Sequence, residues 1–71
     1  MSNEKFLKLI GEQIRKTREE LHVTQSELAR RTDKDRQNIY QIEKGKINVT
    51  VFSLKQIAEA LNVPVKKFFD F

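Results

Sequence analysis

The sequence predicts an all-α fold of five helices in a single domain over residues 1–71. Apolar side chains recur at steps of three and four residues, which is the period of one face of an α-helix. Residues that suit helix N-caps stand before several of these periodic segments. A chain of 71 residues is long enough for one small core. It has no cysteine, so neither disulfides nor thiolate metal sites stabilise it.

The first helix is predicted over about residues 3–21. Its apolar face is formed at steps of four, four, three and four by Phe6, Ile10, Ile14, Thr17 and Leu21. Thr17 is a weak member of this face, because a buried hydroxyl needs a hydrogen-bond partner. The helix is expected to end near His22, since histidine tolerates a positive φ better than most residues other than glycine. This role makes His22 a helix-ending surface residue rather than a catalytic one.

Residues 24–45, TQSELARRTDKDRQNIYQIEKG, are predicted to form two short helices joined by a tight turn at residues 32–34. Thr24 and Glu27 match a T-x-x-E capping box. In this motif the Thr24 hydroxyl accepts from the Glu27 amide, and the Glu27 carboxylate reaches back to the Thr24 amide. Asp35 is placed to cap the second of the two helices, and Gly45 is expected to end it in the left-handed conformation.

The helix predicted over residues 36–44 has two contrasting faces. Ile39 and Ile42 give it a narrow apolar stripe. The opposite face displays four polar or aromatic side chains that can contact base edges: Arg36, Gln37, Tyr40 and Gln41. Because an α-helix fits the major groove of B-DNA, this face is a candidate for reading a DNA sequence.

Two further helices are predicted after residue 49. Thr50 caps a helix that runs to about Leu61, and Asn62 suits a left-handed exit from it. A short last helix is expected over residues 65–69, opened by Pro64.

Hydrophobic staples, in which the residue before a cap packs on the residue five positions later, support these boundaries. The three pairs are Val23 with Leu28, Val49 with Leu54, and Val63 with Phe68. At the start of the 36–44 helix the corresponding pair is Lys34 with Ile39, and there the pattern fails. Lys34 therefore either lays its stem over the edge of the core or reaches a phosphate.

Composition excludes several classes of function. The net charge is +4, and the basic excess is concentrated between residues 30 and 48, which hold six Lys or Arg and three Asp or Glu. His22 is the only histidine, and the chain has no Gly-rich phosphate loop. No catalytic site, metal or cofactor is therefore predicted. Apolar runs are short and no signal-peptide core is evident, so a cytoplasmic protein is expected.

The spacing of residues 10–69 resembles the helix-turn-helix domain of phage repressors and Cro, the XRE family. The matching positions are Ile14-Arg15 with Arg18, Thr24-Gln25 with Leu28-Ala29, Ile39 with Ile42-Glu43 and Gly45-Lys46, Asn48-Val49-Thr50, and Leu54 with Ile57-Ala58, Ala60-Leu61 and Val63. The length and the Asn48-Val49-Thr50 step are also similar to the small controller proteins of restriction–modification systems. The resemblance implies a compact five-helix repressor-like domain whose second and third helices form the helix-turn-helix.

Four residues depart from the family pattern around the predicted turn and the first helix. Thr17, Thr32 and Lys34 stand where the family usually has apolar residues, and Asp33 stands where it often has glycine. We expect a less apolar packing around the turn, with the fold retained. Asp33 can still adopt a left-handed conformation with less strain than most residues.

The resemblance implies DNA contacts at the matching positions. Base contacts are expected from Arg36, Gln37, Tyr40 and Gln41, because arginine suits guanine and glutamine suits adenine. Phosphate contacts are expected from Gln25, Asn38, Lys34, Lys44, Lys46 and Asn48. A solvated surface is the plainer alternative for these side chains, except that Asn38 has a capping contact and Lys34 the edge of the core as the alternative. The resemblance further implies a largely buried salt bridge between Arg18 and Glu43.

The predicted function is that of a sequence-specific transcriptional regulator that binds double-stranded DNA and is not an enzyme. A palindromic operator and a homodimer are expected, because one such helix contacts few bases. The candidate dimer interface consists of Val65, Phe69, Phe71 and Phe52, with core packing as the alternative. The alternative function is an antitoxin-like module whose main contact is another protein.

Overall fold

The structure is a computed structural model that describes residues 2–71. Its helices, in chain order, are α1 (Asn3–Glu20), α2 (Gln25–Arg31), α3 (Arg36–Glu43), α4 (Val51–Leu61) and η1 (Val65–Phe69). The part of the chain that the structure describes contains no strand, so the all-α prediction is confirmed. The fifth element, the short last helix predicted over residues 65–69, is a 3₁₀ helix. Its five residues are too few for a stable α-helix, and 3₁₀ geometry is common in such short pieces.

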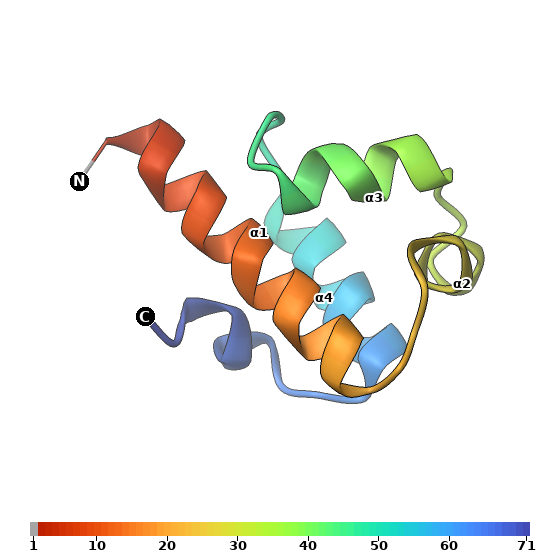
Figure 1. Cartoon of the computed structure of the whole chain (residues 1–71). Helices are drawn as coiled ribbons and strands as arrows, with labels where there is room; N and C mark the ends of the chain where they lie inside the picture. The colour runs from red at the N-terminus through yellow and green to blue at the C-terminus, as the bar shows by residue number, and fades with distance from the viewer. Residues whose placement is uncertain (1) are drawn as a thin grey trace.

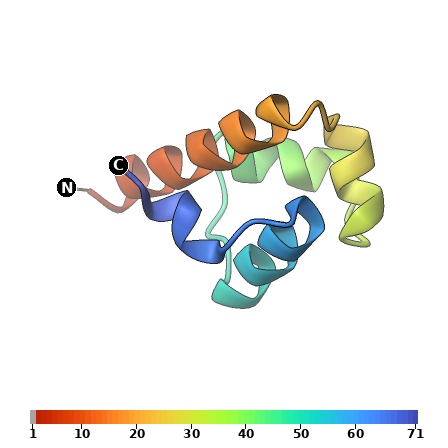
Figure 2. The same cartoon turned by 90° about the horizontal axis from the view of Figure 1, so that it is seen from below.

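The longest helix, α1, is the element against which α3 and η1 pack. It crosses the whole molecule, with α3 on one side and η1 on the other (Figures 1 and 2). Helix α2 packs against α3 and α4, and α4 packs against η1. Because η1 returns along α1, the two ends of the described chain lie at the same end of the molecule (Figure 2). No helix within residues 2–71 is both long and apolar enough to cross a membrane.

One hydrophobic core holds these helices together. Its fully or nearly buried side chains are Ile10, Ile14, Val23, Leu28, Ala29, Ile39, Ile42, Leu54, Ile57, Ala58, Leu61 and Phe68. Val49 and Val63 pack against this cluster, so every member of the three predicted staples contributes to one core. At the two ends of the predicted apolar face of α1, the prediction was wrong. Phe6 is 40% exposed and Leu21 is 46% exposed, because the core covers only the middle of this long helix.

The polar residues that depart from the family pattern are accommodated by local hydrogen bonds. The Thr17 hydroxyl donates to the Gln13 carbonyl at 2.8 Å, and the Thr32 hydroxyl donates to the Leu28 carbonyl at 2.8 Å. Both threonines are buried, and each hydroxyl donates to the backbone carbonyl one helical turn earlier, so neither is left without a hydrogen-bond partner. Asp33 adopts a left-handed conformation with φ of 55°. The turn between α2 and α3 is therefore formed without the usual apolar residues and glycine.

The predicted helix ends agree closely with the structure. The side chains of Thr24, Asp35 and Thr50 each accept a hydrogen bond from a first-turn amide. The residues expected in the left-handed region have positive φ: His22, Gly45 and Asn62.

One half of the predicted capping box is wrong. The Glu27 carboxylate accepts from Arg30 and Arg31 and does not reach back to the Thr24 amide. The hydrogen bond from Arg30, followed by that from Arg31, lowers the pKa of Glu27 to about 2. Two guanidinium groups three and four residues away attract the carboxylate more strongly than one backbone amide does.

Candidate nucleic-acid interface

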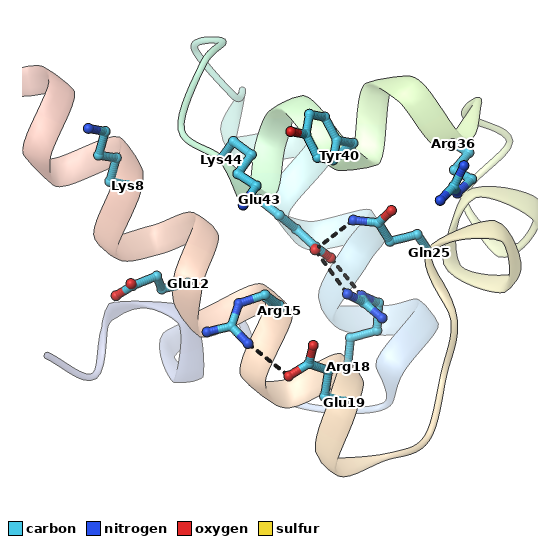
Figure 3. A pocket seen from close by; sticks show the side chains of 10 residues that line it. All are labelled: Lys8, Glu12, Arg15, Arg18, Glu19, Gln25, Arg36, Tyr40, Glu43 and Lys44. Carbon is cyan, nitrogen blue, oxygen red and sulfur yellow. Dashed lines mark hydrogen bonds and ion pairs between the residues drawn. The ribbon is translucent and has the colours of Figure 1, made fainter.

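A buried ion pair between α1 and α3 fixes the position of α3. Arg18 Nε donates to Glu43 Oε2 at 2.7 Å, and Arg18 Nη2 donates to Glu43 Oε1 at 3.0 Å (Figure 3). The side chain of Glu43 is 2% exposed and that of Arg18 is 10% exposed. The hydrogen bond to Glu43 raises the pKa of Arg18 against the opposing effect of its burial. The ion pair therefore lies in a site where neither side chain is well solvated.

The start of α2 is tied to the same carboxylate. Gln25 Nε2 donates to Glu43 Oε1 at 3.0 Å. The remaining guanidinium nitrogen of Arg18, Nη1, donates to the Val23 carbonyl at 2.9 Å. Helices α1, α2 and α3 thus meet at one carboxylate, which sets the angle between the two motif helices.

The surface next to the contacts of Arg18 and Gln25 with Glu43 is concave. A basin of about 640 Å³ opens between α1 and α3, and it is lined by Gln25, Arg36, Tyr40 and Lys44 among others (Figure 3). A smaller hollow of about 210 Å³ is lined by Gln25, Arg36, Gln37 and Tyr40. The structure thus brings Gln25 of α2 together with three of the four side chains of α3 that the sequence predicted as base contacts.

The C-terminal end of α3 has a basic edge formed by Tyr40, Lys44 and Lys46. The ammonium groups of Lys44 and Lys46 each lie 5.7 Å from the centre of the Tyr40 ring. Such cation–π contacts are weak at an exposed site, so they keep the lysines on the surface while leaving them free to bind an anion. This edge continues the surface of Arg36 and Gln37 along α3.

The other predicted contact residues lie outside the basin. Gln41 is half-buried and lines neither hollow. The backbone amide of Asn38 donates to Asp35 Oδ1 at 2.7 Å, and its side chain is half-buried. Lys34 Nζ donates to Ser53 Oγ at 3.2 Å, which holds the side chain against α4. Asn48 lines a separate apolar groove beside the N-terminal half of α1. Their contacts with DNA stay predictions.

Sequence reasoning did not place any outward-facing residue of α1 in this site. The basin is also lined by Lys8, Glu12, Arg15 and Glu19. Their positions, separated by four, three and four residues, are those of one helix face. This spacing is visible in the sequence, but only the tertiary structure shows that this exposed face lines the same basin as α3.

Comparisons with known proteins identify the family. The model of the helix-turn-helix family matches residues 14–68. A Rhodospirillum rubrum protein named as an uncharacterized transcriptional regulator in the ATPase CF(0) region is 37% identical over 61 residues. That alignment covers 86% of this chain and 56% of the relative, so the chain spans little more than half of that protein.

Solved structures share the whole fold. The restriction–modification controller protein C.AhdI from Aeromonas hydrophila is similar with a TM-score of 0.92 and 25% identity, over 97% of this chain and all of that chain. A point mutant of the restriction–modification controller protein C.Esp1396I is similar with a TM-score of 0.85 and 35% identity, over 93% of this chain and 88% of that one. Because the family model matches residues 14–68 and these structures share the fold over 97% and 93% of the chain, the chain belongs to the XRE-type helix-turn-helix family.

Proposed function

We propose that this protein is a sequence-specific transcriptional regulator that places α3 in the major groove of double-stranded DNA. The observation that carries this proposal is the convergence of Gln25, Arg36, Gln37 and Tyr40 on one hollowed surface. These side chains offer donors and acceptors for base edges and phosphates. The relative from R. rubrum, named as a transcriptional regulator, and the two controller proteins support the same function.

We assign base contacts to Arg36, Gln37, Tyr40 and Gln41, and phosphate contacts to Gln25, Asn38, Lys34, Lys44, Lys46 and Asn48. Gln25 has two roles in this scheme. Its side chain donates inward to Glu43, and it stands at the start of α2, where free amides and the helix dipole attract a phosphate. Lys44 and Lys46 position the flanking backbone, which carries no sequence information.

Selection of binding sites from a random DNA duplex library, followed by sequencing, tests this proposal directly. We expect enrichment of one motif with two-fold symmetry and half-sites about 34 Å apart. Binding should weaken with salt at a log–log slope of about −0.9 for each phosphate neutralised. The proposal fails if no duplex sequence is enriched. Tight binding of a protein partner that is insensitive to salt would instead support the antitoxin-like alternative.

The division between base and backbone contacts is tested by Gln37→Ala and Lys46→Ala. The first change should relax the preference at one base position and cost about 1–3 kcal/mol on the best site. The second should weaken all sequences nearly equally and reduce the salt slope by about one. Competition binding against single-base operator variants measures both effects. Uniform loss of affinity in both proteins would contradict the division.

We further propose that the protein binds DNA as a homodimer through Val65, Phe69, Phe71 and Phe52. Phe52 is 65% exposed, and Val65, Phe69 and Phe71 are between 39% and 49% exposed, which leaves a considerable apolar area in contact with water. The rings of Phe69 and Phe71 lie 6.2 and 5.8 Å from that of Phe6, so they form an aromatic surface at one end of the molecule. A second copy that packs on this surface would remove it from water.

The variant Phe52→Lys should be monomeric, because a charge would be buried in an apolar interface. Sedimentation equilibrium measures the effect, and we expect dimer affinity to fall at least tenfold. Leu21→Lys is the matched control, since Leu21 is also a large exposed apolar residue but is not part of the proposed interface. Equal dissociation by both variants, or by neither, would refute the proposed interface.

A further inference from the structure

Helix α1 presents a charged stripe to the same basin that the α3 contacts line. The stripe consists of Lys8, Glu12, Arg15 and Glu19, which line the basin and follow one another along α1 (Figure 3). Residues separated by three or four positions share one helix face, so the stripe is continuous over three turns. It faces the side of α3 that carries Tyr40 and Lys44.

Two of the four charges in this stripe are paired with each other. Arg15 Nη1 donates to Glu19 Oε1 at 2.8 Å. Lys8 and Glu12 form no ion pair within residues 2–71, although both are exposed in the basin. The net electrostatic effect of α1 on an anion in the basin therefore depends on Lys8 and Glu12.

The position of Lys8 is fixed by close backbone packing. A Cβ atom built on Gly45 would lie 2.7 Å from the Lys8 backbone nitrogen. The turn that ends α3 thus rests directly on the backbone of Lys8, and Gly45 is flanked in sequence by Lys44 and Lys46. One lysine of α1 and two lysines of the turn that follows α3 are thus close together. Glu43, the acidic residue nearest to this turn in sequence, is already engaged by Arg18 and Gln25.

We propose that α1 is part of the DNA interface. Lys8 binds a phosphate of the backbone strand that runs along the basin past Gln25 and Lys44. Glu12, one turn further along α1, repels the same strand and so reduces affinity for DNA of any sequence. This inference rests on the proposed function, but it assigns to α1 a contribution that the helix-turn-helix motif itself does not include.

The pair of variants Lys8→Gln and Glu12→Gln tests the proposal, because the two changes should act in opposite directions. Lys8→Gln should reduce the log–log salt slope by about 0.9 per bound chain. At low salt this variant should bind DNA more weakly than the wild type. When the salt concentration is raised from about 50 to 200 mM, the affinity of the wild type should fall by a factor about 3.5 times larger than the factor for the variant. Glu12→Gln should raise affinity about twofold at low salt, as expected for a screened charge roughly 8 Å from a phosphate.

Lys16→Gln and Glu20→Gln are the matched controls, since both residues are exposed on α1 and line no part of the basin. Binding of a mixed-sequence DNA duplex is measured by fluorescence anisotropy at several salt concentrations, and thermal melting confirms that every variant is folded. If each control changes affinity as much as its partner in the basin, only net charge matters and the proposal is overturned. Wild-type salt slopes retained in Lys8→Gln would also overturn it, with the proposed function intact. Failure of the wild type to bind any duplex would overturn both.

Discussion

Replacing Glu43 with alanine is expected to remove a large part of the protein's stability. The change removes the acceptor of three hydrogen bonds and leaves the Arg18 guanidinium nearly buried without its counter-charge. Breaking one partner of such a pair costs about 3–5 kcal/mol. A chain of 71 residues has roughly 4–11 kcal/mol of total stability. The melting temperature, followed by circular dichroism, should therefore fall by at least about 12 °C.

Two further variants separate the buried charge from other effects of this change. Glu19→Ala removes an ion pair whose side chains are 39% and 54% exposed, and it should alter stability by no more than about 1 kcal/mol. The double variant Arg18→Met with Glu43→Leu removes both charges and should recover most of the stability lost in Glu43→Ala. A double variant as unstable as Glu43→Ala would mean that the stranded charge is not the cause.

Gly11→Ala should also destabilise the protein, although alanine is the better helix former. A Cβ atom at this position would lie 2.4 Å from the Glu43 carbonyl oxygen and 2.5 Å from that of Ile42. Both are backbone atoms, so α1 and the end of α3 must separate to admit the methyl group. Overpacking of this kind costs about 1–3 kcal/mol or more, which exceeds the roughly 1 kcal/mol gained in helix propensity.

The affinity for DNA shows whether Gly11→Ala changes the interface or only lowers the stability of the protein. Separation of α1 from α3 displaces the carboxylate of Glu43 from Arg18, so affinity for the selected operator should fall even below the melting transition. Lys16→Ala is the control, because it is an exposed change to alanine in the same helix. Chemical denaturation and operator titration measure the two quantities. A stabilised Gly11→Ala protein with unchanged affinity would show that the two helices do not need this close approach.

The helices of this protein were largely predictable from local sequence. Thr24, Asp35 and Thr50 accept hydrogen bonds from the amides of their own first turns, and His22 and Asn62 reverse the chain after their helices. These interactions involve residues within a few positions of each other, so the sequence pattern contains them. The capping box at Glu27 differs from its prediction because an equally local competitor, the pair Arg30 and Arg31, attracts the carboxylate. Phe6 and Leu21 differ because the extent of the core is not a local property.

The candidate site was predictable only in part. The outward face of α3 followed from helical spacing, and the pairing of Arg18 with Glu43 followed from the family resemblance. Whether a polar side chain is free to contact a ligand depends on its neighbours in space. Lys34 is held by Ser53, which lies 19 positions away in the chain, and this contact has no signature in either segment.

Local sequence patterns were enough to predict which segments are helical, where the helices begin and end, and most of their apolar faces, because these properties depend mainly on interactions between near neighbours. The tertiary structure decided how the polar faces meet. It placed Gln25 on the carboxylate that pairs with Arg18, and it brought the charged stripe of α1 beside Tyr40 and Lys44. It also explains why residue 11 is glycine, since the absence of a side chain there allows α1 to approach the backbone of α3. Such contacts join residues that are far apart in the sequence, and only packing of the whole chain fixes them.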